Sequence, residues 1–164
     1  MAFTSIHLAR IVHRVPVVAL AALAGLLASA SPALAQGGVG LRVGLGLDPD
    51  QFVVGAHAES GPLVESLTFR PSLDVGIGDG LTIVGMNAEF AYHLPVRWSA
   101  WRPYAGGGPA LNLYRPRDGR PAQHAEAGFN GFFGVEHRQG LFAEAKLGAL
   151  ESPSLRVIVG VTFR

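Results

Sequence analysis

Four of the six histidines of this 164-residue chain, two of its serines and several carboxylates are candidates for catalysis. A serine hydrolase needs a hydroxyl within reach of a histidine base, and a third group that orients the base. The candidates for this chemistry are His57, His93, His124, His137, Ser60 and Ser72. Whether any of these side chains can contact one another depends on the secondary structure in which they lie.

The same histidines could instead bind a metal ion. Two ligands are aimed at one point when they stand at i, i+2 on a strand or at i, i+4 on a helix. No two histidines here have either spacing. We therefore expect structural histidines and no metal site.

Gly106, Gly107 and Gly108 invite comparison with a phosphate-binding loop. That loop requires a Lys-Ser/Thr pair after the glycines and a helix behind it, and neither is present in the sequence. We expect no cofactor, and interpret the glycines as room for an inward-facing tyrosine or arginine of a neighbouring strand.

The first 35 residues have the pattern of a secretory signal. Arg10, His13 and Arg14 precede an apolar run over residues 15–27, and Ala33-Leu34-Ala35 forms a small-x-small cleavage site. No later segment approaches the roughly 18 apolar residues of a spanning helix. We therefore predict export through the Sec route and one mature domain over residues 36–164.

Composition excludes several function classes for this domain. The domain holds eleven of the chain's thirteen Lys and Arg and all twelve Asp and Glu, and this near-neutral balance gives no reason to expect nucleic acid. The chain has no cysteine, so disulfides cannot stabilise it. Its 22 glycines suit crowded or bent strands better than helices.

The clearest structural signal is alternation with a period of two residues. In residues 155–164, every second side chain from Leu155 to Phe163 is large and apolar, which indicates a strand. The same alternation recurs in residues 39–47, 52–59, 67–77, 82–94, 102–114, 125–137 and 141–147. Eight such segments joined by turns predict an all-β fold, an eight-stranded antiparallel up-and-down transmembrane β-barrel.

Three prolines fall inside these predicted strands: Pro71, Pro103 and Pro109. A closed barrel has no edge strand, and each proline removes a ladder hydrogen bond. We expect bulges or strand ends at these positions.

The non-apolar face decides which side of the barrel is inside. A water-facing surface should be rich in both signs of charge, yet Lys146 is the only lysine. Arg or Lys facing lipid near the midplane would cost about 2–4 kcal/mol each. We therefore predict that aliphatic side chains face lipid and that charged side chains pair across a filled lumen. The predicted lumen network is Arg42, Arg70, Asp74, Glu89, Glu126, Glu136, Glu144, Lys146 and Arg156.

With the apolar face turned to lipid, the orientation of the closing strand and the place of the aromatic residues can also be predicted. Leu155, Val157, Val159, Val161 and Phe163 should contact lipid, while Arg156 reaches a carboxylate of the lumen. Aromatic side chains near strand ends should form headgroup-level girdles. The predicted girdle is Phe52, Phe69, Tyr92, Trp98, Trp101 and Phe163.

Over residues 36–164 the sequence resembles the small eight-stranded outer-membrane barrels of the OmpA/OmpX-like superfamily. The resemblance is carried by RPYAGGGP at residues 102–109, by FAEA at 142–145 and by the closing strand ending in Phe163. It implies periplasmic termini, turns near Asp48, Asp79, Asp118 and Ser152 outside the cell, and recognition of the terminal aromatic by the barrel-assembly machinery. Arg164, which follows that aromatic, departs from the pattern. The short outer loops count against an adhesin or a phage receptor.

Some small barrels of this superfamily are lipid A deacylases with a His-x-Ser pair on one strand face. No histidine here is followed two residues later by serine. We therefore expect no catalytic residues and no enzyme activity.

These observations together predict a monomeric integral protein of a Gram-negative-type outer membrane, with a structural or envelope-interaction role. Its partners would be outer-membrane lipid and the assembly machinery, and its charged lumen would be a plug rather than a channel. Two alternatives remain: a soluble periplasmic lipocalin-like barrel that binds an apolar ligand inside, and a lipid-modifying outer-membrane enzyme.

Overall fold

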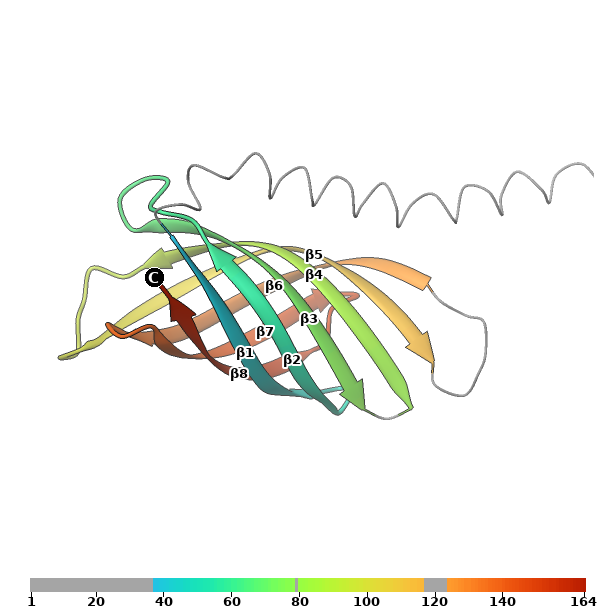
Figure 1. The fold of residues 1–164 in the computed structure, drawn as a ribbon. Coiled ribbons are helices and arrows are strands. Elements are labelled where there is room, and N and C mark those ends of the chain that lie inside the picture. Colours follow the sequence, from blue (N-terminus) through green and yellow to red (C-terminus); the bar gives the residue numbers. More distant parts are fainter. Residues whose placement is uncertain (1–36, 79, 117–123) are drawn as a thin grey trace, which may run out of the picture. The chain divides into compact units, whose positions relative to one another are not determined.

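A computed structural model describes residues 37–78, 80–116 and 124–164 of the chain, which form eight strands (Figure 1). Within these residues, no helix is long and apolar enough to cross a membrane. The predicted signal over residues 1–35 lies outside the described residues and stays a prediction. The strands are β1 (Gly38–Leu47), β2 (Gln51–Glu59), β3 (Leu67–Gly78), β4 (Leu81–His93), β5 (Trp101–Pro116), β6 (His124–His137), β7 (Leu141–Leu150) and β8 (Leu155–Phe163).

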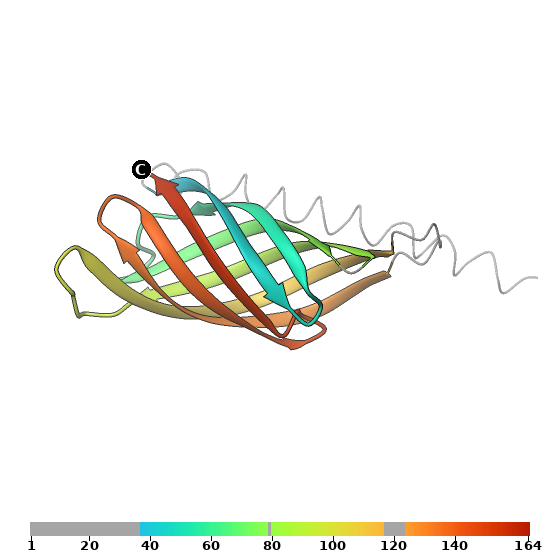
Figure 2. The same cartoon turned by 90° about the horizontal axis from the view of Figure 1, so that it is seen from below.

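Each strand pairs antiparallel with the next, and β8 pairs with β1, so the sheet is a closed up-and-down barrel. The closure runs from Val39 opposite Phe163 to Leu47 opposite Leu155. Figure 2 shows β8 alongside β1. The predicted fold class is confirmed.

The alternation in sequence becomes an alternation between outside and inside. In β8, Val157 and Val159 are exposed, whereas Arg156 and Ile158 are buried. In β1, Leu41 is 61% exposed and its neighbour Arg42 only 3%. Apolar side chains therefore cover the outside of the barrel, and charged and polar side chains fill its interior. Ile83, whose position breaks the apolar alternation of β4, is one of the few aliphatic side chains that face inward.

The two ends of the barrel differ in their connections. Gly38 and Phe163 lie at one end, here called the terminal end, together with the connections β2–β3, β4–β5 and β6–β7. The opposite end carries the turn at Asp48 and the connection containing Ser152. Both were expected in outer turns. The other two expected turn residues, Asp79 and Asp118, lie outside the described residues.

The expected bulges at the prolines are absent. The β3–β4 register runs through Pro71, and the β5–β6 register runs through Pro103 and Pro109, without a shift. Each proline instead lies where the hydrogen-bond ladder to its other neighbouring strand stops or is interrupted. For Pro71, the β2–β3 pairing ends at Ser72. For Pro103 and Pro109, the β4–β5 pairing has no residue pair at these positions. A strand residue directs its N–H to one neighbour only, so a missing N–H is tolerated where that neighbour is unpaired.

Two glycines make room for the largest side chains of the lumen. A Cβ on Gly106 would meet the ring of Phe132, and a Cβ on Gly134 would lie 2.6 Å from the ring of Tyr104. Both rings are buried inside the barrel. Of the three glycines of β5, only Gly106 accommodates an inward ring, and that ring belongs to a phenylalanine rather than to the expected tyrosine or arginine; a Cβ on Gly107 or Gly108 would meet the backbone of a neighbouring strand first.

Candidate functional site

The lumen is centred on one ion pair. Lys146 of β7 places its Nζ 2.7 and 2.8 Å from the two carboxylate oxygens of Glu89 of β4, and 3.6 Å from Oε1 of Glu144. No part of Lys146 is exposed. An ammonium group can be buried this deeply only when carboxylates surround it.

A second pair joins strands β1 and β3. Arg42 donates from Nε and Nη2 to the two carboxylate oxygens of Asp74, at 2.7 and 2.5 Å, and from Nη2 to Ser72 Oγ at 2.6 Å. A bidentate arginine–carboxylate contact fixes both distance and orientation. Asn87 Nδ2 donates to the same Ser72 and Asp74, at 3.0 and 3.1 Å, which connects this pair to β4.

Asn130 links the two pairs to the closing strand. Its Nδ2 donates to Asn87 Oδ1 at 2.8 Å and to Glu89 Oε1 at 3.3 Å. Its Oδ1 accepts a hydrogen bond of 2.8 Å from Arg156 of β8, whose Nη1 lies 3.7 Å from Asp74. Arg156 thus reaches a lumen carboxylate, as the alternation of β8 predicts.

Arg70 extends the network toward the terminal end. Its Nη1 lies 3.2 Å from Glu144 Oε2, which also accepts a 3.1 Å hydrogen bond from the hydroxyl of Tyr104. The guanidinium lies 5.1 Å from the ring centre of Tyr104 and 5.2 Å from that of Phe142. Arginine on an aromatic face gains a cation–π attraction where water is excluded.

Seven of the nine predicted lumen residues therefore belong to one connected set, here called the lumen network. Its members are Arg42, Arg70, Asp74, Glu89, Glu144, Lys146 and Arg156. The other two lie outside it. Glu136 is at the terminal end and is linked to the network only indirectly, through Arg164 and Glu59, whose Oε2 lies 4.0 Å from Arg70 Nε. Glu126 lies beside His124 at a partly exposed end of β6. Sequence reasoning missed the neutral members Ser72, Asn87, Tyr104 and Asn130, although their inward parity in the alternation was available.

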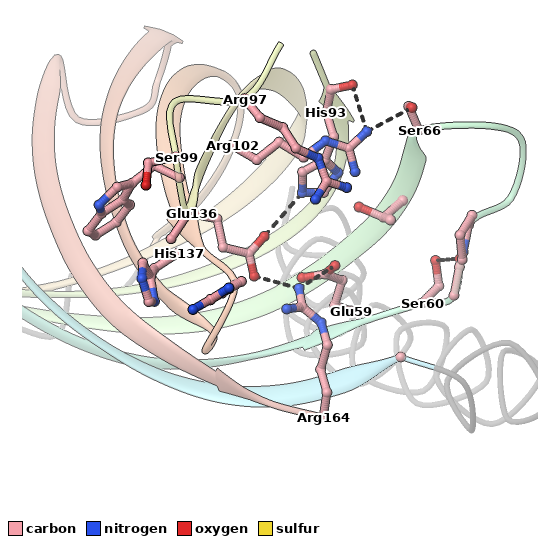
Figure 3. Close-up of a pocket in the computed structure, with 17 residues that line it drawn as sticks. Glu59, Ser60, Ser66, His93, Arg97, Ser99, Arg102, Glu136, His137 and Arg164 are labelled. Atoms are coloured by element: carbon pink, nitrogen blue, oxygen red, sulfur yellow. Dashed lines mark hydrogen bonds and ion pairs between the residues drawn. The ribbon is translucent and has the colours of Figure 1, made fainter. Parts of the chain in front are cut away.

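The terminal end opens into a cavity of about 420 Å³, here called the terminal mouth (Figure 3). Its charged lining residues are Arg97, Arg102, Arg138, Arg164, Glu59 and Glu136. Arg164 Nη2 binds Glu59 Oε1 at 3.0 Å and Glu136 Oε1 at 2.5 Å, so the last residue of the chain crosses the mouth. Burial disfavours the charged guanidinium, but the two carboxylates outweigh it and raise the pKa of Arg164.

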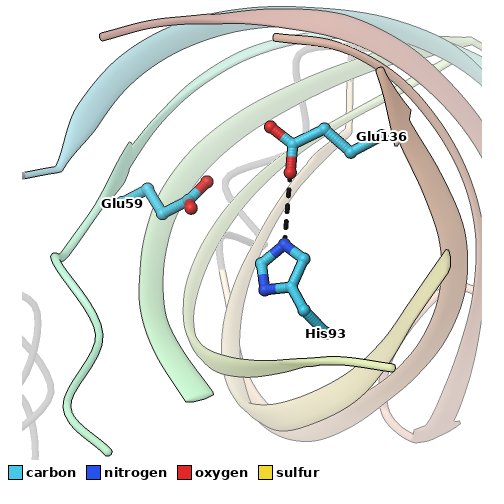
Figure 4. Close-up of side chains that lie close together, drawn as sticks. All are labelled: Glu59, His93 and Glu136. Atoms are coloured by element: carbon cyan, nitrogen blue, oxygen red, sulfur yellow. Dashed lines mark hydrogen bonds and ion pairs between the residues drawn. The ribbon is translucent and has the colours of Figure 1, made fainter. Parts of the chain in front are cut away.

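Glu59, His93 and Glu136 come from three different strands and place one ligand atom each within 4.8 Å of the others (Figure 4). His93 Nε2 lies 3.2 Å from Glu136 Oε2. Such a set could hold a divalent cation, but both carboxylates already bind the guanidinium of Arg164. Spacing along the sequence could not find this triad, because strand register brings its members together.

The other candidate histidines are separate from one another. His57 is buried, with Nε2 3.0 Å from Thr162 Oγ1 and its ring against Phe142. His124 stacks on Tyr114, and His137 contacts Trp101. Ser60 and Ser72 hydrogen-bond to the carbonyl of Gly61 and to Arg42, respectively, so neither has a described hydrogen bond to a histidine.

The six predicted girdle residues are unevenly distributed. Phe69, Tyr92, Trp98, Trp101 and Phe163 lie at or near the terminal end, and Phe52 alone lies at the other. Trp98 and Trp101 close a tight turn through reciprocal backbone hydrogen bonds of 2.9 and 3.0 Å. Both indoles are exposed, at 57% and 39%. The terminal end is therefore the aromatic end of the barrel.

Comparisons with known proteins identify the architecture. No family model and no curated protein matches the sequence. Among solved structures, the crystal structure of the N-terminal β-barrel domain of Pseudomonas aeruginosa OprF matches with a TM-score of 0.57 and 18% identity, covering 78% of this chain and 100% of that one. The chain thus has the eight-stranded barrel fold of the OprF N-terminal domain.

Proposed function

We propose that the chain is a small integral outer-membrane barrel with a structural or envelope-interaction role and a lumen that conducts no ions. The observation that carries the proposal is the inverted polarity of the barrel. Large apolar side chains such as Leu41, Leu147 and Val157 are exposed on the outside, while Arg42, Lys146 and Arg156 are buried inside. A water-soluble protein rarely exposes contiguous apolar surface on this scale, whereas lipid requires it.

The lumen network fills the interior of the barrel and leaves no open path for ions. Its members extend from β1, β3, β4, β7 and β8 into an interior that in an eight-stranded barrel is just wide enough for side chains. Each charge is held by a partner or by a hydrogen bond, so movement of an ion along the axis would require breaking several buried pairs at once.

The chain is exported through the Sec route, recognised by the barrel-assembly machinery through β8, and works as a monomer without catalysis. Support for the last point is the separation of histidines from serines, since no described serine hydroxyl is bonded to a histidine base.

The soluble lipocalin-like alternative needs an apolar interior. Apart from the cluster around Tyr104 and a few aliphatic side chains such as Val53 and Ile83, the interior is filled by charged and polar side chains, and the cavity at the terminal mouth is lined by arginines and glutamates. The structure therefore favours the membrane barrel.

The test combines membrane fractionation with a conductance measurement. The protein should remain in a carbonate-washed outer-membrane pellet, and the purified protein should migrate differently in gels before and after heating. In planar bilayers it should show no stepwise conductance, whereas a sixteen-stranded porin in the same bilayers provides the positive control. Recovery in the soluble fraction would overturn the membrane assignment, and stepwise conductance would overturn the plug.

A further inference from the structure

We propose that the terminal mouth binds the phosphate group of an anionic membrane lipid through Arg97, Arg102 and Arg138. The inference rests on the membrane-embedded barrel proposed above. The terminal mouth carries more positive than negative charge. Four arginines and two glutamates line the mouth, and Arg164 already binds both glutamates. The three remaining arginines have no carboxylate within ion-pairing distance among the described residues.

Arg102 is held in position without being neutralised. Its Nε donates to the carbonyl oxygen of Leu94 at 3.4 Å, and its Nη2 donates to Ser66 Oγ at 3.0 Å and to the carbonyl oxygen of His93 at 3.4 Å. All three acceptors are uncharged. Its Nη1 makes no hydrogen bond to the described residues and remains a donor for an anion. An arginine fixed in this way can meet a phosphate without first losing side-chain freedom.

The backbone brings Arg97 and Arg138 to the same mouth. The N–H of Arg138 donates to the carbonyl of Ala100 at 3.0 Å, which holds the β6–β7 turn against the β4–β5 connection. Arg97 directly precedes the Trp98–Trp101 turn in that connection. Both arginines are exposed, and both line the cavity with Arg102. Figure 3 shows Arg97 beside Arg102.

The surroundings indicate a lipid as the source of the phosphate. Exposed Trp98 and Trp101 flank the arginines, and tryptophan in membrane proteins sits at headgroup level. In helical membrane proteins, basic pockets near the membrane surface bind the headgroups of anionic lipids. The cavity of about 420 Å³ gives a headgroup room, and exposed Trp101 is part of its lining, so acyl chains could stay on the outside of the barrel.

The experiment uses the full mature barrel refolded in zwitterionic micelles, with heat-modifiable migration as the check of folding. Titration with phosphatidylglycerol, with phosphatidylcholine and with inorganic phosphate is followed by native mass spectrometry and by thermal shift. Phosphatidylglycerol should bind at least tenfold tighter than either other probe. Higher salt should weaken it, because exposed charges are screened.

Variants Arg97→Gln and Arg138→Gln should each lower this affinity severalfold, and the double variant by roughly thirtyfold. Arg115→Gln, which removes an exposed arginine at the opposite end of the barrel, is the matched control and should change nothing. Equal affinities for the two lipids, or an unchanged affinity in the double variant, would overturn the site. Equally tight inorganic phosphate would overturn lipid as the source. A barrel that stays soluble without detergent would instead contradict the proposed function, whatever it binds.

Discussion

Lys146 Nζ lies within 2.8 Å of both carboxylate oxygens of Glu89, and neither side chain is open to solvent. The two residues are 57 positions apart and belong to strands β7 and β4, which are not neighbours in the sheet. This pair therefore crosses the lumen and fixes the distance between opposite walls of the barrel.

Replacing one member of this pair should cost more than replacing both. Lys146→Met leaves the Glu89 carboxylate buried without its ammonium partner, and we expect a loss of about 3–5 kcal/mol in the free energy of unfolding. The double variant Lys146→Met/Glu89→Leu should recover most of that loss. Urea unfolding in lipid vesicles measures both. Glu126→Gln, outside the lumen network, is the control, and equal losses in the single and double variants would contradict a coupled pair.

An arginine introduced on the outer wall should destabilise the barrel more, the closer it lies to the centre of the bilayer. Val159 is exposed at the centre of β8, and Val159→Arg should destabilise the inserted barrel by about 2–4 kcal/mol. Leu47→Arg, at the last residue of β1, should cost about 0–1 kcal/mol because it lies near the interface. Folding into vesicles measures the difference. Equal costs at the two positions would show that Val159 does not face the bilayer interior.

Gly134 should be intolerant of a methyl group. A Cβ at this position would lie 2.6 Å from the ring of Tyr104, which is fully buried and cannot move aside. We expect Gly134→Ala to lose about 1–3 kcal/mol of stability. On the same strand, Gly131 has no heavy atom nearer than 4.0 Å to such a Cβ. Gly131→Ala should therefore be far milder, and a similar loss at both positions in urea unfolding would refute the steric explanation.

Arg164 should exclude metal ions from the Glu59–His93–Glu136 triad. Arg164→Ala removes the guanidinium that binds both carboxylates and leaves three ligands within 4.8 Å of one another. We expect this variant to bind Zn²⁺ in calorimetric titration and the wild type not to bind it. Adding His93→Ala should abolish the binding. Zinc binding by the wild type, or binding that does not depend on His93, would contradict the idea.

The fold could be predicted from the sequence because apolar and polar residues alternate along each barrel strand, which identifies both the strand and its two faces. Strand positions agree within one to three residues: β5 continues to Pro116 rather than Tyr114, and β7 to Leu150 rather than Leu147. These extensions pair with neighbouring strands in the register already set, which alternation within one segment does not specify.

The site could be predicted only in part, because alternation assigns a residue to a face but not to a partner. Alternation puts Arg42, Glu89 and Lys146 on the inner face, but it does not say which of them meet. Glu59, His93 and Glu136 converge because of the relative stagger of three strands. Asn87 and Asn130 carry no charge and were overlooked, although they connect the two central ion pairs. The bridging position of Arg164 depends on where β8 ends relative to β2 and β6.

The pairing of Val39 with Phe163 has a kinetic consequence. The first and last strands are the most distant in sequence, so β1 has an open edge until β8 arrives, and β7 has one as well. Exposed strand edges promote aggregation, and contacts of such long sequence separation form slowly. An intermediate that lacks only β8 would expose two unpaired edges together with the apolar wall between them. We therefore expect the folding rate to depend on how quickly the nine residues of β8 pair with β1. Until they do, a chaperone should be needed to cover the open edges.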